Sequence, residues 1–145
     1  MKYDVEHLRA SMNQLANVHN RYQGKYKKVL FVCSAGLLRS ATAAHVFSAE
    51  PYNFNTRTAG VAIEYALNPV NEALLEWADH IFLMEQEHYD TLEHSFGSED
   101  MADYKAKMTV LNIPDNFEYR NPKLISLLKE KVEERLGWYT TEDAS

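Results

Sequence analysis

The chain has 145 residues, of which 46% are hydrophobic and 25% are charged, and its formal net charge is −6. This length and composition predict a single globular domain and argue against a largely disordered protein. The acidic balance argues against a general affinity for nucleic acid or acidic membranes. It leaves room for a local anion site, because such sites are built from backbone amides at a helix N-terminus.

The chain contains one cysteine, so no intramolecular disulfide can form and a zinc site made of cysteines is excluded. Residues 1–10 lack the apolar core of a signal peptide, and no apolar run approaches membrane-spanning length. We therefore expect a cytoplasmic protein without a membrane partner. The six histidines form no evident metal-binding set, and no metal or other cofactor is expected.

Helices and strands are predicted to alternate along one domain, residues 1–145. An amphipathic helix over residues 4–22 gives an N-terminal helical extension (1–26) in front of a core (28–137). The strands of the core are predicted at residues 29–32, 54–59, 80–84 and 108–113. The first predicted helix of the core covers residues 40–49, and the second runs from Asn68-Pro69 through Trp77. A third helix starts at about Gln86 and is followed by a loop or irregular helix at 95–103. The last helix runs from Asn121-Pro122 to Gly137.

Strands that alternate with helices indicate an α/β fold with a parallel sheet covered on both sides. Ligands of such sheets bind beyond the carboxyl ends of the strands. The residues that directly follow the first buried strand, which ends at Val32, are therefore the first candidates for a functional site.

A cysteine, five residues, an arginine and a serine follow Val32 in the motif Cys33-Ser34-Ala35-Gly36-Leu37-Leu38-Arg39-Ser40. A tight loop that runs into a helix aims its backbone amides at one point, and this suits a phosphate group. The same field favours a thiolate, so Cys33 is the expected nucleophile. Arg39 is expected to grip two phosphate oxygens, Ser40 to donate its hydroxyl to the thiolate, and Gly36 to permit a positive φ.

A lone cysteine after a strand is more often a small buried hydrophobic residue than a nucleophile. The spacing to Arg39 and Ser40, between a predicted strand and a predicted helix, favours the phosphate-binding loop.

This motif, with Val29 to Val32 before it and Ala43 and Phe47 after it, resembles the opening of the low-molecular-weight protein tyrosine phosphatases, especially small bacterial members. The likeness continues in three further segments and covers roughly residues 28–137; the segments are Thr58-Ala59-Gly60, residues 77–85 and residues 113–119. It implies a three-layer α/β/α fold with a four-stranded parallel sheet and a phosphate-binding loop after the first strand.

The resemblance also implies a general acid on a late loop, and the matching residue is Asp115. Family members often follow this acid with proline and an aromatic residue. Here Pro114 precedes it, Asn116 follows it, and Phe117 takes the aromatic place, where it is expected to form a wall against a phenyl ring. Alternatively, Asp115 serves only as a turn or capping residue.

Two departures from the family concern the loop itself. Many members have asparagine where this chain has Gly36, and the lost side chain removes a brace of the loop. A second loop cysteine of some members is Leu38 here, so a protective loop disulfide is excluded.

Two other groups of residues are given structural roles. The acidic set Glu85, Glu87, Asp90 and Glu93 is interpreted as a solvated helix face. The aromatic residues Tyr52 and Phe54 either edge the mouth of the site or pack in the core.

The predicted function is hydrolysis of phosphotyrosine, or of another aryl phosphate, through a phosphocysteine intermediate. The catalytic residues are Cys33, Arg39 and Asp115, and the substrate-binding residues are Ser34, Ala35, Gly36, Leu37, Leu38, Ser40 and Phe117. The partner is a phosphotyrosine protein or a small aryl phosphate, with no nucleic acid, and the oligomeric state stays open.

Two alternatives share the same loop. One is an arsenate reductase that uses an external thiol, because arsenate fits the same phosphate-binding loop. Arsenate reductases that relay oxidation through further cysteines are excluded, because the chain has one cysteine. A module that binds a phosphorylated ligand without turning it over is the other alternative, since Gly36 and the altered acid loop depart from the family.

Overall fold

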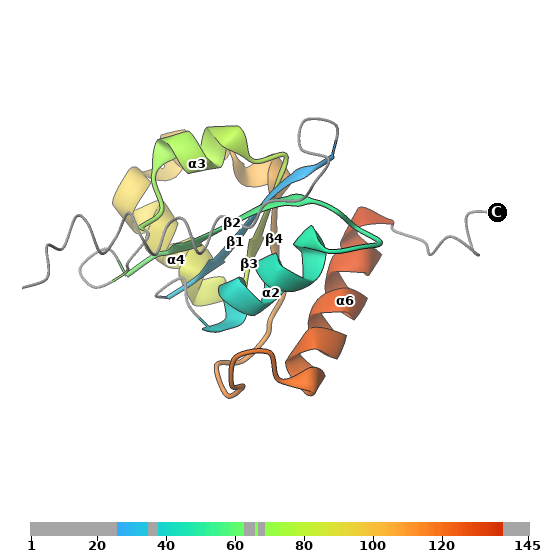
Figure 1. The fold of residues 1–145 in the computed structure, drawn as a ribbon. Helices are drawn as coiled ribbons and strands as arrows, with labels where there is room; N and C mark the ends of the chain where they lie inside the picture. Colours follow the sequence, from blue (N-terminus) through green and yellow to red (C-terminus); the bar gives the residue numbers. More distant parts are fainter. Residues whose placement is uncertain (1–25, 35–37, 63–65, 67–68, 138–145) are drawn as a thin grey trace, which may run out of the picture.

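The computed structural model describes residues 26–34, 38–62, 66 and 69–137 of the chain (Figure 1). The helix predicted over residues 4–22 lies outside these ranges, as do residues 35–37 of the loop motif. Within the described ranges, no helix is both long enough and apolar enough to cross a lipid bilayer.

A parallel sheet lies at the centre of the fold, in the strand order β2-β1-β3-β4. Val32 of β1 is in register with Ala59 of β2 on one side and with Leu83 of β3 on the other. The continuous apolar run of β1 is buried, as expected for a strand in the middle of a parallel sheet. The strands are β1 (Lys28–Cys33), β2 (Asn55–Gly60), β3 (His80–Leu83) and β4 (Met108–Val110).

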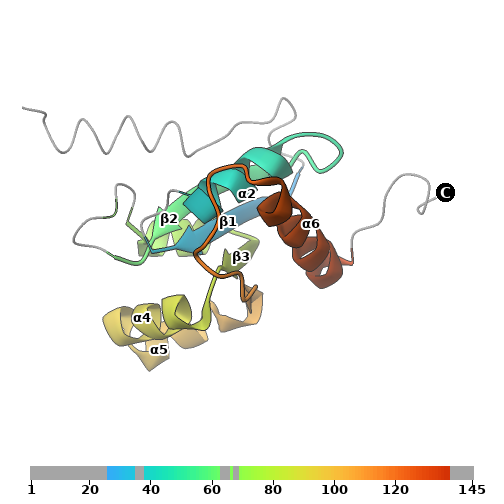
Figure 2. The ribbon, with the colours of Figure 1, turned by 90° about the horizontal axis from the view of Figure 1, so that it is seen from below.

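Helices cover both faces of the sheet; they are α2 (Leu38–Ser48), α3 (Glu72–Trp77), α4 (Gln86–Phe96), α5 (Ser98–Ala102) and α6 (Pro122–Leu136). Because side chains alternate along a strand, Val29 and Phe31 pack with α2 and α6, while Leu30 and Val32 pack with α3, α4 and α5. Figure 2 shows α2 and α6 on one side of the sheet and α4 and α5 on the other. The predicted three-layer α/β/α fold is therefore confirmed.

The ends of α6 agree with the prediction, whereas the start of α3 does not. Asn121 caps α6 by accepting a hydrogen bond from the Lys123 amide at 2.8 Å, and Gly137 ends the helix with a positive φ of 63°. The predicted start of the earlier helix at Asn68-Pro69 is wrong. Pro69 forms a parallel bridge with Gly60, so the chain is still extended there.

The N-cap of α3 is Asn71, three residues later, and its side chain accepts a hydrogen bond from the Leu74 amide at 3.0 Å. The stretch predicted as loop or irregular helix divides at Gly97, whose φ of 88° separates α4 from the short α5. Tyr52 and Phe54 lie in the core on the α2 and α6 face, so the packing alternative holds for both.

Candidate active site

The carboxyl ends of three neighbouring strands meet at one edge of the sheet. The ladder of hydrogen bonds continues past the strand ends, from the Met84 amide to the Val32 carbonyl at 3.0 Å and from the Ile113 amide to the Met84 carbonyl at 2.8 Å. This register brings the residues after β1, β3 and β4 side by side, although they are far apart in the sequence. The site is built from Cys33 at the end of β1 and Ser34 after it, from Glu85 after β3, and from the segment from Ile113 to Asp115 after β4.

Cys33 is the last residue of β1, and its side chain is buried with an exposed fraction of 4%. Its sulfur lies 2.7 Å from the hydroxyl oxygen of Ser40, which comes from the first turn of α2 and is fully buried. The loop motif thus brings its two ends together. The hydroxyl is placed where it can donate to a thiolate, as the sequence predicts.

Arg39 is also buried, with an exposed fraction of 2%, and it does not extend into solvent. Its Nη1 donates to Glu85 Oε2 and to the Ile113 carbonyl, both at 2.8 Å. Its Nε lies 3.7 Å from Asp115 Oδ1. A buried guanidinium requires such partners, because leaving it unpaired costs several kcal/mol, on the order of 3–5.

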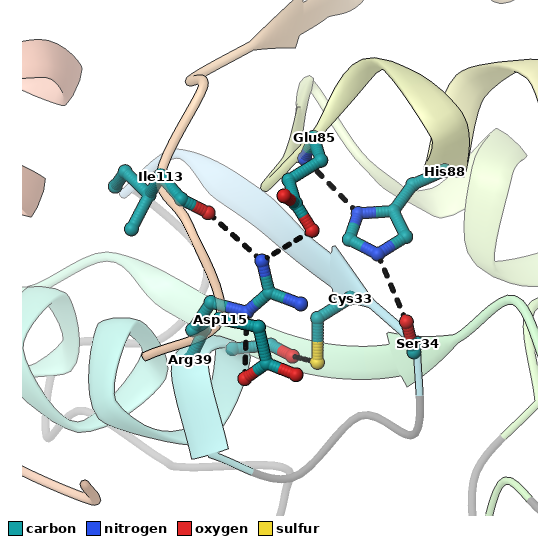
Figure 3. Close-up of polar contacts among 8 residues, drawn as sticks. Cys33, Ser34, Arg39, Glu85, His88, Ile113 and Asp115 are labelled. Carbon is teal, nitrogen blue, oxygen red and sulfur yellow. Dashed lines mark hydrogen bonds and ion pairs between the residues drawn. The ribbon is translucent and has the colours of Figure 1, made fainter. Parts of the chain in front are cut away.

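The contacts of Arg39 leave one edge of the guanidinium turned toward the sulfur. Within the described ranges, no residue pairs with Nη2, and Figure 3 shows the guanidinium between Cys33 and the segment that carries Ile113. A planar fork held in this way can present Nε and Nη2 to two oxygens of an anion.

Asp115 lies on the loop between β4 and α6, and its side chain is 61% exposed. Its carboxylate faces the guanidinium of Arg39 (Figure 3). The loop is tied to α2 further along, where the Arg120 amide donates to the buried Thr42 hydroxyl at 2.9 Å. Phe117 is half-buried and packs against the core on the α2 and α6 face. Its role as a wall for a substrate ring stays a prediction.

The interpretation of Glu85 as part of a solvated helix face is wrong. Glu85 precedes α4, follows β3, and accepts a hydrogen bond from Arg39 Nη1. The signal for this role was present in the sequence. Glu85 directly follows a buried strand, so the rule that pointed to Cys33 also points to it.

His88 is a second site residue that the sequence interpretation missed. Its exposed fraction is 1%, and its Nε2 lies 3.1 Å from the Ser34 hydroxyl oxygen. Its Nδ1 accepts a hydrogen bond from the Glu85 amide at 3.0 Å. Burial, and then the positive charge of Arg39, lower the pKa of His88 to about 4, so the ring is neutral at physiological pH.

Glu85, Glu87 and His88 have potential ligand atoms within 4.8 Å of one another. His88 would have to give up a hydrogen bond to bind an ion, because one ring nitrogen is occupied by the Glu85 amide and the other by Ser34. The arrangement therefore favours a hydrogen-bonding role over metal binding.

The remaining predicted loop residues are Ala35, Gly36 and Leu37, which lie outside the described ranges, and Leu38, which opens α2. Their substrate-binding roles stay predictions.

No family model matches the sequence, and no curated protein matches it either. Solved structures do match. The structure of a YwlE mutant from Bacillus subtilis is 25% identical, covers 77% of this chain and 99% of its own, and has a TM-score of 0.57. A cysteine-to-serine mutant of YwlE arginine phosphatase with a phosphorylated active-site serine is 24% identical, covers 76% of this chain and 95% of its own, and has a TM-score of 0.55.

The low-molecular-weight protein tyrosine phosphatase SP-PTP from Streptococcus pyogenes is 15% identical, covers 81% of this chain and 97% of its own, and has a TM-score of 0.58. Nearly the whole of each of these proteins is thus matched by about three quarters or more of this chain. YwlE is named an arginine phosphatase, and SP-PTP is named a tyrosine phosphatase. The resemblance that the loop motif indicates is confirmed, and the chain has the fold of the low-molecular-weight protein tyrosine phosphatases.

Proposed function

We propose that the chain is a cysteine-dependent phosphatase that hydrolyses phosphotyrosine, or another aryl phosphate, through a phosphocysteine intermediate. The observation that carries this proposal is the convergence of three groups. The Cys33 sulfur, the Ser40 hydroxyl 2.7 Å from it, and the Arg39 guanidinium held by Glu85 and Ile113 meet at the end of β1. A nucleophile, a donor to its thiolate and a bidentate cation are the groups that phosphoryl transfer from an ester requires.

In the first step, the Cys33 thiolate attacks phosphorus in line with the leaving oxygen, so the S–P bond forms as the P–O bond breaks. Arg39 and the loop amides stabilise the charge on the equatorial oxygens. Asp115 supplies the proton that the departing phenolate needs, and its exposed position beside Arg39 supports this role.

In the second step, the Asp115 carboxylate takes a proton from water, and the water oxygen attacks phosphorus. The S–P bond breaks, and inorganic phosphate leaves. Cys33 returns to the thiolate, which the Ser40 hydroxyl is placed to stabilise. No cofactor enters either step.

Phosphoarginine is a second candidate substrate, because one of the matching structures is an arginine phosphatase with a phosphorylated active-site serine. The same loop chemistry serves a P–N bond, with Asp115 protonating the departing guanidine. A matched pair of peptides that carry either phosphotyrosine or phosphoarginine separates the two substrates.

The test compares phosphate release by the wild type and by Cys33→Ser from p-nitrophenyl phosphate and from both peptides. We expect turnover of p-nitrophenyl phosphate and of the phosphotyrosine peptide by the wild type, and none by Cys33→Ser. A serine hydroxyl is not appreciably ionised near neutral pH, so the variant should keep its fold and lose its nucleophile. Arg39→Lys should also lose most activity, with Arg120→Lys, an exposed arginine outside the motif, as its control.

Three results would change the assignment. Release of phosphate from the phosphoarginine peptide alone assigns the second substrate. Wild-type rates in Cys33→Ser contradict the covalent mechanism, and no turnover of any substrate contradicts the enzyme.

A further inference from the structure

A hydrogen bond joins α4 to the start of the phosphate-binding loop. His88 Nε2 lies 3.1 Å from the Ser34 hydroxyl oxygen, although the residues are 54 positions apart. Ser34 directly follows the proposed nucleophile Cys33, and the side chain of His88 is almost completely buried. In Figure 3 the Ser34 hydroxyl points to the imidazole of His88 rather than to the Cys33 sulfur. Its direct partner is therefore the histidine.

The donor of this bond follows from the other ring nitrogen. The Glu85 amide donates to His88 Nδ1 at 3.0 Å, so Nδ1 carries the lone pair and cannot carry the proton of a neutral ring. The proton is on Nε2, and His88 donates to Ser34 Oγ. A backbone amide thus fixes the tautomer that the contact with Ser34 needs.

Both ends of the loop are held from the same short segment. Glu85 holds Arg39 at one end through the 2.8 Å ion pair, and His88 holds Ser34 at the other. The backbone of Ser34 is also fixed, since its carbonyl accepts a hydrogen bond from the Ala62 amide at 2.9 Å. The side-chain bond to His88 therefore holds Ser34 from the α4 side while the backbone bond holds it from the β2 side.

We propose that His88 is a positioning residue of the phosphate site, which acts through Ser34 to hold in place the residue that directly follows Cys33. This role rests on the proposed function of the loop but is separate from the chemical step. Backbone amides that converge on an anion bind it less tightly when one side of the loop moves. A misplacement of about 1 Å can lower the reaction rate on the order of a hundredfold.

Two substitutions separate this role from simple packing. The amide of asparagine lies near the place of Nδ1, so His88→Asn keeps an acceptor for the Glu85 amide and loses the donor to Ser34. The longer glutamine places an N–H near the position of Nε2, so His88→Gln restores that donor. The control is His94→Gln, the same change on an exposed histidine in the last turn of the same helix.

The first measurement is the affinity for inorganic phosphate, by calorimetry, together with kcat and KM for p-nitrophenyl phosphate and the melting temperature. We expect His88→Asn to weaken phosphate binding and to lower kcat/KM by about tenfold, and His88→Gln to stay within about threefold of the wild type. The His94→Gln control should match the wild type. Equal losses in His88→Asn and His88→Gln at equal melting temperatures overturn the proposal.

The second measurement is a double-mutant cycle with Ser34→Ala. If His88 acts through Ser34, then His88→Asn costs nothing further in the Ser34→Ala background. Fully additive losses overturn the proposal. If the wild type binds no phosphate, the proposed function of the loop is contradicted, and the role of His88 with it. If the wild type and His88→Asn bind phosphate equally well, only the role of His88 is contradicted.

Discussion

The carboxylate of Glu85 lies 2.8 Å from the guanidinium of Arg39, and the two residues belong to different elements of the fold. Glu85 follows β3, and Arg39 lies in the first turn of α2. The ion pair fixes the direction in which the buried Arg39 points. The orientation of its guanidinium therefore depends on a residue outside the loop motif.

Replacement of Glu85 separates orientation from charge. Glu85→Ala removes the acceptor of Nη1, so we expect kcat/KM for p-nitrophenyl phosphate to fall by about ten- to a hundredfold and the free energy of unfolding to fall by about 1–3 kcal/mol. Glu85→Gln keeps an oxygen acceptor and removes a negative charge from beside the anion, and its kcat/KM should fall by less than about fivefold. Steady-state kinetics and urea unfolding measure the two effects.

Glu87→Ala is the control for this pair, because Glu87 is exposed and no contact joins it to Arg39 within the described residues. Wild-type kinetics in Glu85→Ala would show that the Ile113 carbonyl orients the guanidinium alone.

Ser40→Ala tests the donor beside the nucleophile. The hydroxyl lies 2.7 Å from the Cys33 sulfur, and its bond is worth most when the sulfur carries a full negative charge. In the proposed mechanism the thiolate is the leaving group of the second step, so we expect hydrolysis of the phosphocysteine to slow by about tenfold or more. Rapid mixing with p-nitrophenyl phosphate should then show a burst of nitrophenolate that equals the enzyme concentration.

Ser48→Ala controls for the loss of a hydroxyl from the same helix, because Ser48 donates to the His45 carbonyl at the far end of α2. A lower kcat in Ser40→Ala without a burst would place the effect on the first step instead.

The sheet and the loop motif after its first strand could be predicted because both depend on local patterns. The apolar run from Val29 to Val32 needs burial on both faces, and the spacing from Cys33 to Arg39 is itself the signal of the loop. Parallel strands then place their carboxyl ends together whatever lies between them, which is why the edge that carries the site could be predicted.

The supporting residues could not be predicted in the same way, because their partners lie far away in the sequence. His88 is 54 positions from Ser34, and its spacing resembles that of any helical histidine. The error at α3 has a similar origin. Asn68 and Asn71 are both good N-caps by chemistry, and the bridge between Gly60 and Pro69 decides between them.

His88 also makes stability depend on pH. Its pKa is about 4 in the folded protein and near 6.5 in the unfolded chain, so the unfolded chain binds more protons between these values. The contribution of His88 is complete above pH 6.5 and is lost as the pH falls to 4. The charged groups that face it are Arg39, which lowers its pKa, and Glu85 and Asp115, which raise it.

We therefore expect the free energy of unfolding to fall by up to about 1.4 kcal/mol for each pH unit below 6.5, measured by urea titration at several pH values. His88→Gln should flatten this slope. The pKa values of His45 and His80 are also lowered by burial, so part of the slope should persist in the variant. Parallel curves for the two proteins would contradict a buried neutral His88.

Asp115 is the residue whose replacement separates an enzyme from a binding module. A general acid matters most when the leaving group is basic and least when it departs unaided. We therefore expect Asp115→Asn to slow hydrolysis of phenyl phosphate by about a hundredfold or more, and to slow phosphorylation of Cys33 by p-nitrophenyl phosphate much less. Burst kinetics on both esters separate this step from hydrolysis of the intermediate.

Glu118 is the other carboxylate of the same loop, and it is exposed. Glu118→Gln is therefore both the control and the test of the alternative acid. If Asp115 is the acid, Glu118→Gln keeps wild-type rates on both esters, and the loss in Asp115→Asn grows with the pKa of the leaving phenol. If Asp115→Asn keeps wild-type rates and Glu118→Gln shows that dependence instead, the proton comes from Glu118. In that case the 3.7 Å contact between Asp115 and Arg39 serves to orient the guanidinium.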